Sequence, residues 1–410
     1  MGTRAFVNKR YQASTRPSAK SGDAPLLITV ITLLAFGLLM LYSASVDYSV
    51  EILGEGPNYM LKRQVLWLLL GIAAAFILSH LDYHYWRRLA VLSMLGTVVA
   101  LIGVLLISEL RLGAVRTVYN GSIQPSELAK LTTVIYLAVW LYAKRAQLHN
   151  IELGLIPLAI ILGLIGGLIY LQPDLSATAT VFILGGTLFF LAGADMKQLI
   201  ILMVLAALVA WVVIQFSEKG QERVEFYWLG LKDPMNASYH VRRALEAIVN
   251  GGFLGLGIGK SLTKLTGLPV PPTDSIFAVV AEEFGIFGAS ILILLYAVLI
   301  WRSLVIARRA PDMLGTLLAT GLAFWIGIEA LINMTVMVGL LPVAGNALPF
   351  ISAGGSSLVT SLAAMGIIYN VSRQRGEESQ AEDEWRAFGA TADLRRRNGR
   401  RGYTRTRRSR

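Results

Sequence analysis

The 410-residue sequence contains no cysteine, and only 15% of its residues are charged. The absence of cysteine excludes disulfides, thiol catalysis and thiolate metal sites. Soluble domains carry roughly 25% charged residues, so the shortage of charge argues against a soluble protein. Hydrophobic residues make up 55% of the chain, and the mean hydropathy is +0.60. We therefore interpret the chain as an integral membrane protein.

Ten segments are apolar over roughly the 20 residues that a helix needs to cross a bilayer. Solid runs such as LGLIPLAIILGLIGGLIYL lack the alternation of β-barrel strands, so we expect an all-α protein with ten transmembrane helices. The first run is long and many more follow, which favours a retained helix over a signal peptide. The predicted spans lie near residues 25–45, 64–81, 89–107, 128–143, 153–171, 176–193, 198–216, 284–307, 313–340 and 348–370.

Most of the formal net charge of +11 lies in the two tails. Residues 1–24 carry five Lys/Arg against Asp23, and residues 371–410 carry twelve Arg against six acids. By the positive-inside rule both tails face the cytoplasm, flanking a membrane domain of residues 25–370. The arginine-rich tail has no folded reader module around it, so we expect contact with anionic lipid and no nucleic-acid partner.

This orientation places residues 217–283, between spans 7 and 8, in a long extracytoplasmic loop. The stretch YHVRRALEAIVNGGFLGLG within it is amphipathic and ends in glycine-rich turns. The following GGFLGLGIGKS is no phosphate-binding loop of the Walker type, because Leu254 stands where that motif requires glycine.

Three acids in TDSIFAVVAEEFGIFG, Asp274, Glu282 and Glu283, border or enter an apolar run. A carboxylate near lipid is costly unless it is paired or hydrated, so it is by default a functional candidate. Adjacent helical residues diverge by about 100°, so only one glutamate can share a face with Asp274. Candidate cationic partners are Arg242, Arg243, Lys260, Lys264, Arg116 and Lys130.

Other polar groups have both a structural and a functional interpretation. Glu127 and Lys130 in QPSELAK are three residues apart and can form an ordinary helical ion pair, or line an anion-binding surface with Arg116. Asp174 in QPDLSA can be a helix cap or a site residue. Glu329 and Asn333, four residues apart, share one helix face, where polar contact between helices is the structural account.

Six strings occur in order between about residues 25 and 372: YSAS, GAVR with QPSELAK, QPDLSATA, GGFLGLGIGKS, TDSIFAVVAEEFGIFG and MVGLLPVAGNALPFISAGGSSL. Together they resemble the SEDS family (shape, elongation, division and sporulation), and YSAS and LPFIS are closer to its FtsW-like than its RodA-like members. The resemblance implies a peptidoglycan glycosyltransferase of the bacterial cytoplasmic membrane, active in cell division or elongation. It would polymerise lipid II on the outer face with a class B penicillin-binding protein and other divisome or elongasome membrane proteins.

The resemblance also implies that Asp274 is the catalytic aspartate. A carboxylate there would accept the proton of the attacking sugar hydroxyl. Cationic side chains or a divalent cation (Mg or Mn) would stabilise the leaving pyrophosphate. The candidate substrate-binding residues are Arg116, Glu127, Lys130, Asp174, Arg242, Lys260, Glu282, Glu283 and Ser356.

The chain departs from the family pattern beside Asp274. Pro272 and Ser275 replace a histidine and a phenylalanine usual in the family, and His240 is the other outer-layer histidine. Two alternatives stay open: a lipid II flippase or transporter, and a non-catalytic scaffold that activates a penicillin-binding partner. A transporter would favour two repeated halves, and the sequence shows no such repeat.

Overall fold

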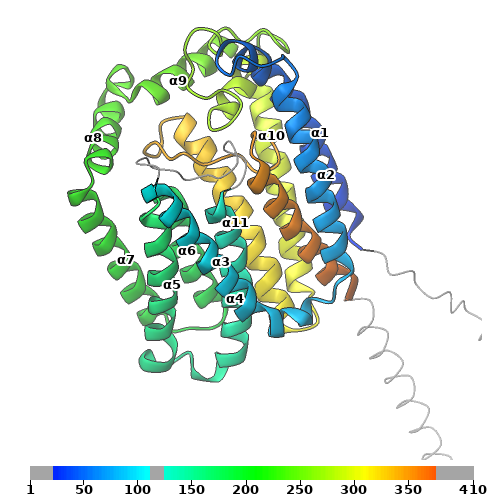
Figure 1. The fold of residues 1–410 in the computed structure, drawn as a ribbon, viewed down its shortest axis with the longest axis vertical. Coiled ribbons are helices and arrows are strands. Elements are labelled where there is room, and N and C mark those ends of the chain that lie inside the picture. Colours follow the sequence, from blue (N-terminus) through cyan, green and yellow to red (C-terminus); the bar gives the residue numbers. More distant parts are fainter. Residues whose placement is uncertain (1–21, 111–123, 375–410) are drawn as a thin grey trace, which may run out of the picture.

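The computed structural model describes residues 22–110 and 124–374, and these residues form helices and connecting turns without a β-strand (Figure 1). The long helices are α1 (Ala24–Glu51), α2 (Tyr59–His80), α3 (Trp86–Leu110), α4 (Pro125–Lys144), α5 (Ile156–Tyr170), α6 (Leu175–Leu191), α7 (Met196–Phe216), α8 (Glu218–Lys232), α9 (Tyr239–Gly251), α10 (Ile276–Arg308) and α11 (Met313–Met337). A further helix covers residues 355–374.

The all-α membrane fold is confirmed. Within the described residues, seven helical stretches are long and apolar enough to cross a bilayer. They are α1, α2, Tyr83–Leu106, Ile151–Tyr170, α7, α10 and α11. The 17-residue α6 is apolar but shorter. Each of the ten predicted ranges overlaps a helix, and the protein is a multi-pass membrane protein.

Helices α10 and α11 lie in the middle of the bundle (Figure 1). α10 packs against α1, α9 and α11, while α11 also contacts α4 and α6. α7 lies at the edge, with most of its side chains exposed, as expected for a helix facing lipid. α9 lies at one end of the bundle, and residues 22 and 374, where the described chain begins and ends, lie at the other. There Asp23 N donates to Ser372 Oγ.

α10, which carries the eighth predicted span, begins at Ile276, and its break at Gly285 separates residues 276–284 from the apolar stretch predicted to start near residue 284. Residues 276–281 are apolar and buried, so their backbone is satisfied inside a helix. The segment 217–283 is also largely helical, since it holds α8, α9 and the start of α10. The amphipathic stretch predicted within it forms α9.

α10 is interrupted at Gly285, whose φ of 69° and ψ of −173° are non-helical. The glycine-rich loop 251–257 fills this break: Leu256 N and Gly257 N donate to Glu282 O and Glu283 O at 3.0 and 2.9 Å. A side chain at Gly285 would meet the Phe253 carbonyl, so this position requires glycine for conformation and for space. The predicted glycine-rich turns are present, and they bring the loop backbone against α10.

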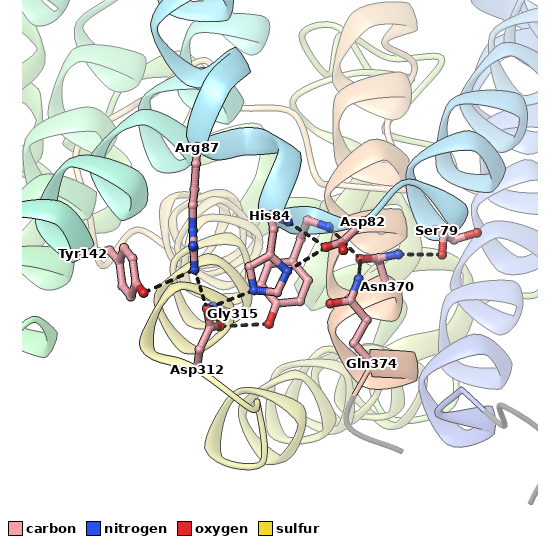
Figure 2. Close-up of polar contacts among 10 residues, drawn as sticks. Ser79, Asp82, His84, Arg87, Tyr142, Asp312, Gly315, Asn370 and Gln374 are labelled. Atoms are coloured by element: carbon pink, nitrogen blue, oxygen red, sulfur yellow. Dashed lines mark hydrogen bonds and ion pairs between the residues drawn. The ribbon is translucent and has the colours of Figure 1, made fainter. Parts of the chain in front are cut away.

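A polar cluster, here called the Asp312 cluster, fastens the start of α11 (Figure 2). Asp312 Oδ1 accepts from Gly315 N and from the Tyr83 hydroxyl, both at 2.8 Å, which caps the helix. Asp312 Oδ2 lies 3.2 Å from both Arg87 Nη2 and His84 Nε2. The cluster joins the turn between α2 and α3 to α11.

Candidate active site

Asp274 lies in the turn that precedes α10, and its residue is half-buried. Its backbone carbonyl accepts a hydrogen bond from Asn333 Nδ2 at 2.8 Å. Its side chain lies over Gly345, where an added Cβ would stand 3.2 Å from Asp274 Oδ2. The carboxylate is therefore held close to the backbone of the segment that follows α11.

Two carboxylates and one ammonium meet between α4 and α11, and we call them the α4–α11 ion cluster. Lys130 Nζ lies 2.8 Å from Glu127 Oε1 and also pairs with Glu329. All three residues are buried. Their formal charges sum to −1, and Glu127 Oε2 has no hydrogen-bond partner among the described residues. Because buried charge is costly unless it is compensated, this cluster is a candidate functional site.

The sequence explains how α4 delivers these groups. Pro125 occupies the first turn, where its missing N–H costs nothing. Glu127 lies in the same turn, at the positive end of the helix dipole. Lys130 follows three residues later on the same face, so the predicted helical ion pair is confirmed. The contact with Glu329 extends that pair to a second helix.

Asp174 and Ser356 both reach the start of α4. Asp174 caps α6 by accepting from Ala177 N at 3.1 Å, as its capping interpretation predicted. Its Oδ2 also accepts from Gln124 Nε2 at 2.8 Å and from Ser126 Oγ at 3.0 Å. Gln124 N donates to Ser356 Oγ at 3.1 Å. The cap is thus also part of a polar network beside the ion cluster.

α11 links the ion cluster to Asp274. Glu329 and Asn333 lie one turn apart on this helix; the first binds Lys130 and the second donates to the Asp274 carbonyl. The structure therefore places five of the predicted site residues in polar groups that α4 and α11 join, and we call these groups the network: Asp274, Glu127, Lys130, Asp174 and Ser356.

Glu282 and Glu283 anchor the neighbouring loop to α10 and α1 and do not join this network. Glu282 accepts from the Ser261 and Thr263 hydroxyls and from Leu262 N and Thr263 N. Glu283 accepts from Ser43 Oγ at 2.6 Å and pairs with Lys264 at 3.3 Å. Lys264, one of the predicted cations, is thus the partner of Glu283.

Within the described part of the chain, Arg242, Arg243 and Lys260 make no contact with the network, and Arg243 pairs with Glu246 instead. Arg242 is exposed, with its guanidinium 5.7 Å from the Tyr239 ring centre and 3.5 Å from Met235 O. Lys260 is exposed in the glycine-rich loop. Arg116 falls outside the described residues.

His240 reaches the residue that follows Asp274. Its Nε2 lies 2.6 Å from Ser275 Oγ, while the Ser275 hydroxyl donates to Pro269 O. Since that hydroxyl proton is already used, His240 Nε2 must be the donor. Burial lowers the pKa of His240, which keeps the ring neutral near pH 7. His240 therefore supports the Asp274 turn through Ser275.

Several residues that contact the site lay outside the predicted set of site residues: Gln124, Ser126, Glu329, Asn333 and Ser352. Gln124 is the first residue of QPSELAK and carries no charge. Only its contacts with Asp174 and Ser356 in the structure indicate that it belongs to the site. The four-residue spacing of Glu329 and Asn333 did indicate a shared face. No sequence pattern indicated that Ser352 Oγ would donate to Thr273 O.

Residues 24–377 match the model of the cell cycle protein family of FtsW, RodA and SpoVE. The chain is 36% identical to stage V sporulation protein E of Bacillus subtilis (strain 168), over 86% of this chain and 97% of that protein. It is also 36% identical to the probable peptidoglycan glycosyltransferase FtsW of Geobacter sp. (strain M18), over 86% and 98%.

Two solved structures share the fold. One comes from work on the structural coordination of polymerization and crosslinking by a peptidoglycan synthase complex: TM-score 0.69, 28% identity, 87% of this chain and 98% of that chain covered. The crystal structure of the Thermus thermophilus rod shape determining protein RodA gives a TM-score of 0.61 at 27% identity with the same coverage. The chain belongs to the FtsW, RodA and SpoVE family of cell cycle proteins.

Proposed function

We propose that the protein is a peptidoglycan glycosyltransferase that polymerises lipid II, the undecaprenyl-linked disaccharide peptide, with Asp274 as general base. The observation that carries this proposal is the connection, through α11, between the half-buried Asp274 and the buried α4–α11 ion cluster. The name of the Geobacter relative supports the same reaction class.

The proposed reaction needs one proton acceptor and a path for the leaving group. Asp274 accepts the proton of the acceptor sugar hydroxyl as its oxygen attacks the anomeric carbon of the donor. The bond between that carbon and the pyrophosphate oxygen breaks, and undecaprenyl pyrophosphate leaves with the bonding electrons. General-base assistance of this kind contributes about 10²- to 10⁴-fold. The stereochemistry inverts if no glycosyl-enzyme intermediate forms.

The leaving pyrophosphate requires positive charge. Lys130 is the described cation of the network, and it already contacts two carboxylates. Arg116 and Arg242 remain proposed contributors. The described residues contain no group of three His, Asp or Glu side chains arranged for a metal ion, so we derive no step from a bound metal. Dependence on Mg²⁺ or Mn²⁺ stays a prediction, and metal titration of the purified protein would test it.

We further propose that all ten helices in the predicted ranges cross the membrane, with both tails in the cytoplasm. An even number of spans places both tails on one side, and residues 22 and 374 lie at the same end of the bundle (Figure 1). α9 and the Asp274 turn would then face outward, where lipid II is polymerised. The proposed partners are a class B penicillin-binding protein, which crosslinks the strands, and other divisome or elongasome membrane proteins.

The test is polymerisation of labelled lipid II by the purified protein, with and without a class B penicillin-binding protein, read as chain length on a gel. We expect Asp274→Asn to reduce polymer formation by about 10²-fold or more. Glu225→Gln is the matched control, because Glu225 is an exposed carboxylate of the same outer segment.

Glycan strands of normal length from Asp274→Asn would reject the base assignment. Lipid II translocation in vesicles without polymer would favour the flippase, and stimulation of the partner that survives Asp274→Asn would favour the scaffold.

A further inference from the structure

Three consecutive backbone carbonyls hold the turn that carries Asp274. Each accepts a hydrogen bond from α11 or from the segment that follows it. The three bonds run from Ala353 N to Pro272 O at 2.8 Å, from Ser352 Oγ to Thr273 O at 2.6 Å, and from Asn333 Nδ2 to Asp274 O at 2.8 Å. The position of the carboxylate is therefore set by α11 and residues 344–353 as much as by α10.

Asn333 makes the contact closest to the carboxylate. Its Nδ2 donates to Asp274 O and to Asn346 O, at 2.8 and 2.7 Å. Two carbonyl acceptors require the amide nitrogen to face them, which fixes the orientation of the side chain. Asn333 is 1% exposed, and its Oδ1 has no hydrogen-bond partner among the described residues. The amide thus leaves a buried acceptor unsatisfied and uses both of its donors on these two carbonyls.

These two bonds connect the backbone of Asp274 with the backbone of Asn346 through one side chain. One side is the backbone of Asp274 itself, and the other is Asn346, whose neighbour Gly345 lies against Asp274 Oδ2. Gly345 has no Cβ, but one added there would stand 3.2 Å from that oxygen, so a side chain at this position would crowd the carboxylate. Asn333 therefore sets the separation between the Asp274 backbone and the segment that carries Gly345.

We propose that Asn333 is a positioning residue for Asp274. It touches backbone and not the reacting atoms, so it acts through Asp274, and the proposal rests on the proposed function of that aspartate. Its place on α11, one turn from Glu329, also sets Asp274 relative to the α4–α11 ion cluster. A displacement of about 1 Å at a reacting group can cost about 10²-fold in rate, so loss of this bond acts on the turnover rate.

The test compares kcat and KM for lipid II, per folded molecule, in Asn333→Ala and Asn370→Ala. Asn370 is a matched control because it is also buried and its side chain also binds backbone, Ser79 O (Figure 2) and Tyr83 N, beside the Asp312 cluster. We expect Asn333→Ala to lower kcat by about 10- to 100-fold with KM changed by less than about threefold. Asn370→Ala should lower thermal stability while kcat is kept.

Two further variants keep the proposal falsifiable if Asn333→Ala does not fold. Asn333→Asp keeps the shape but sets carboxylate oxygens against two carbonyls, so it should lower kcat more than alanine does. Gly345→Ala presses on Asp274 Oδ2 without removing a donor, and should also lower kcat selectively. Suppose that the wild type polymerises lipid II and Asp274→Asn does not. Unchanged kcat in the folded Asn333 variants, or in Gly345→Ala, would then overturn the inference. Polymer from Asp274→Asn would instead overturn the proposed function.

Discussion

The inner face of α11 carries the α4–α11 ion cluster, and its beginning carries the Asp312 cluster; the two differ in exposure and charge balance. The Asp312 side chain is 22% exposed and its partner Arg87 is 43% exposed. The Glu329 and Lys130 side chains are 2% and 4% exposed. Water therefore screens the first cluster, whereas neighbouring groups alone must compensate the second.

This difference in exposure indicates a structural role for the Asp312 cluster and a functional role for the α4–α11 ion cluster. In the Asp312 cluster, a helix cap and the partly exposed links to His84 and Arg87 join α3 and the turn before it to α11, and excess charge there is solvated. In the α4–α11 ion cluster, two carboxylates share one ammonium out of reach of water, so a charged substrate can change its electrostatic balance. A buried imbalance of this kind is typical of sites.

Burial alone does not mark the site, as Glu282 shows. It is fully buried, yet both of its oxygens accept hydrogen bonds from hydroxyls and backbone N–H groups of residues 261–263. A carboxylate whose acceptors are all used within the fold has a structural role. Glu127 and Glu283 differ in this respect, because each keeps one oxygen without a hydrogen-bond partner among the described residues.

Removing the single ammonium of the ion cluster should produce the largest effect on stability. Lys130→Met leaves two buried carboxylates without a cation and should lower the free energy of unfolding by about 3–5 kcal/mol. Polymerisation should be lost in parallel. Thermal unfolding of the purified protein measures the first effect. The double variant Lys130→Met/Glu329→Gln removes one of the unpaired charges and should recover part of the loss.

Breaking one link of the Asp312 cluster should have a much smaller effect. Arg87→Ala removes the pair with Asp312 and the stacking of the guanidinium 4.8 Å from the Tyr142 ring centre. Exposed pairs contribute about 0–1 kcal/mol, so we expect a stability loss of that size and activity within about twofold. The loss should shrink in about 1 M salt, where the Debye length is about 3 Å. If Arg87→Ala destabilises the protein as much as Lys130→Met, the contrast between the clusters is wrong.

The sequence predicted the local part of this picture. Apolar runs located the helices, and spacing along one helix paired Glu127 with Lys130 and aligned Glu329 with Asn333, because these relations depend on helical geometry alone. The contacts of Asp174 with Gln124 and of Asn333 with Asp274 join residues 50 and 59 positions apart, and no local pattern encodes them. For the same reason the sequence did not indicate the donors that Glu282 and Glu283 bind, which come from residues 261–264 and from α1.

The smallest expected effect concerns His240, which supports the turn that carries Asp274. Because burial lowers its pKa in the folded state, the unfolded chain binds the proton more readily. The resulting stabilisation is present above the unfolded value of about 6.5 and is lost as pH falls through the lower folded value. His240→Gln should cost about 0.5–1.5 kcal/mol near pH 7.5, the size of one hydrogen bond, and should flatten the fall in thermal stability on acidification. Tyr239→Phe is the control, because it loses a bond to Gly267 O in the same region without a group that titrates near neutral pH. An equally steep acid profile in His240→Gln and wild type would show that the ring is not held neutral by its surroundings.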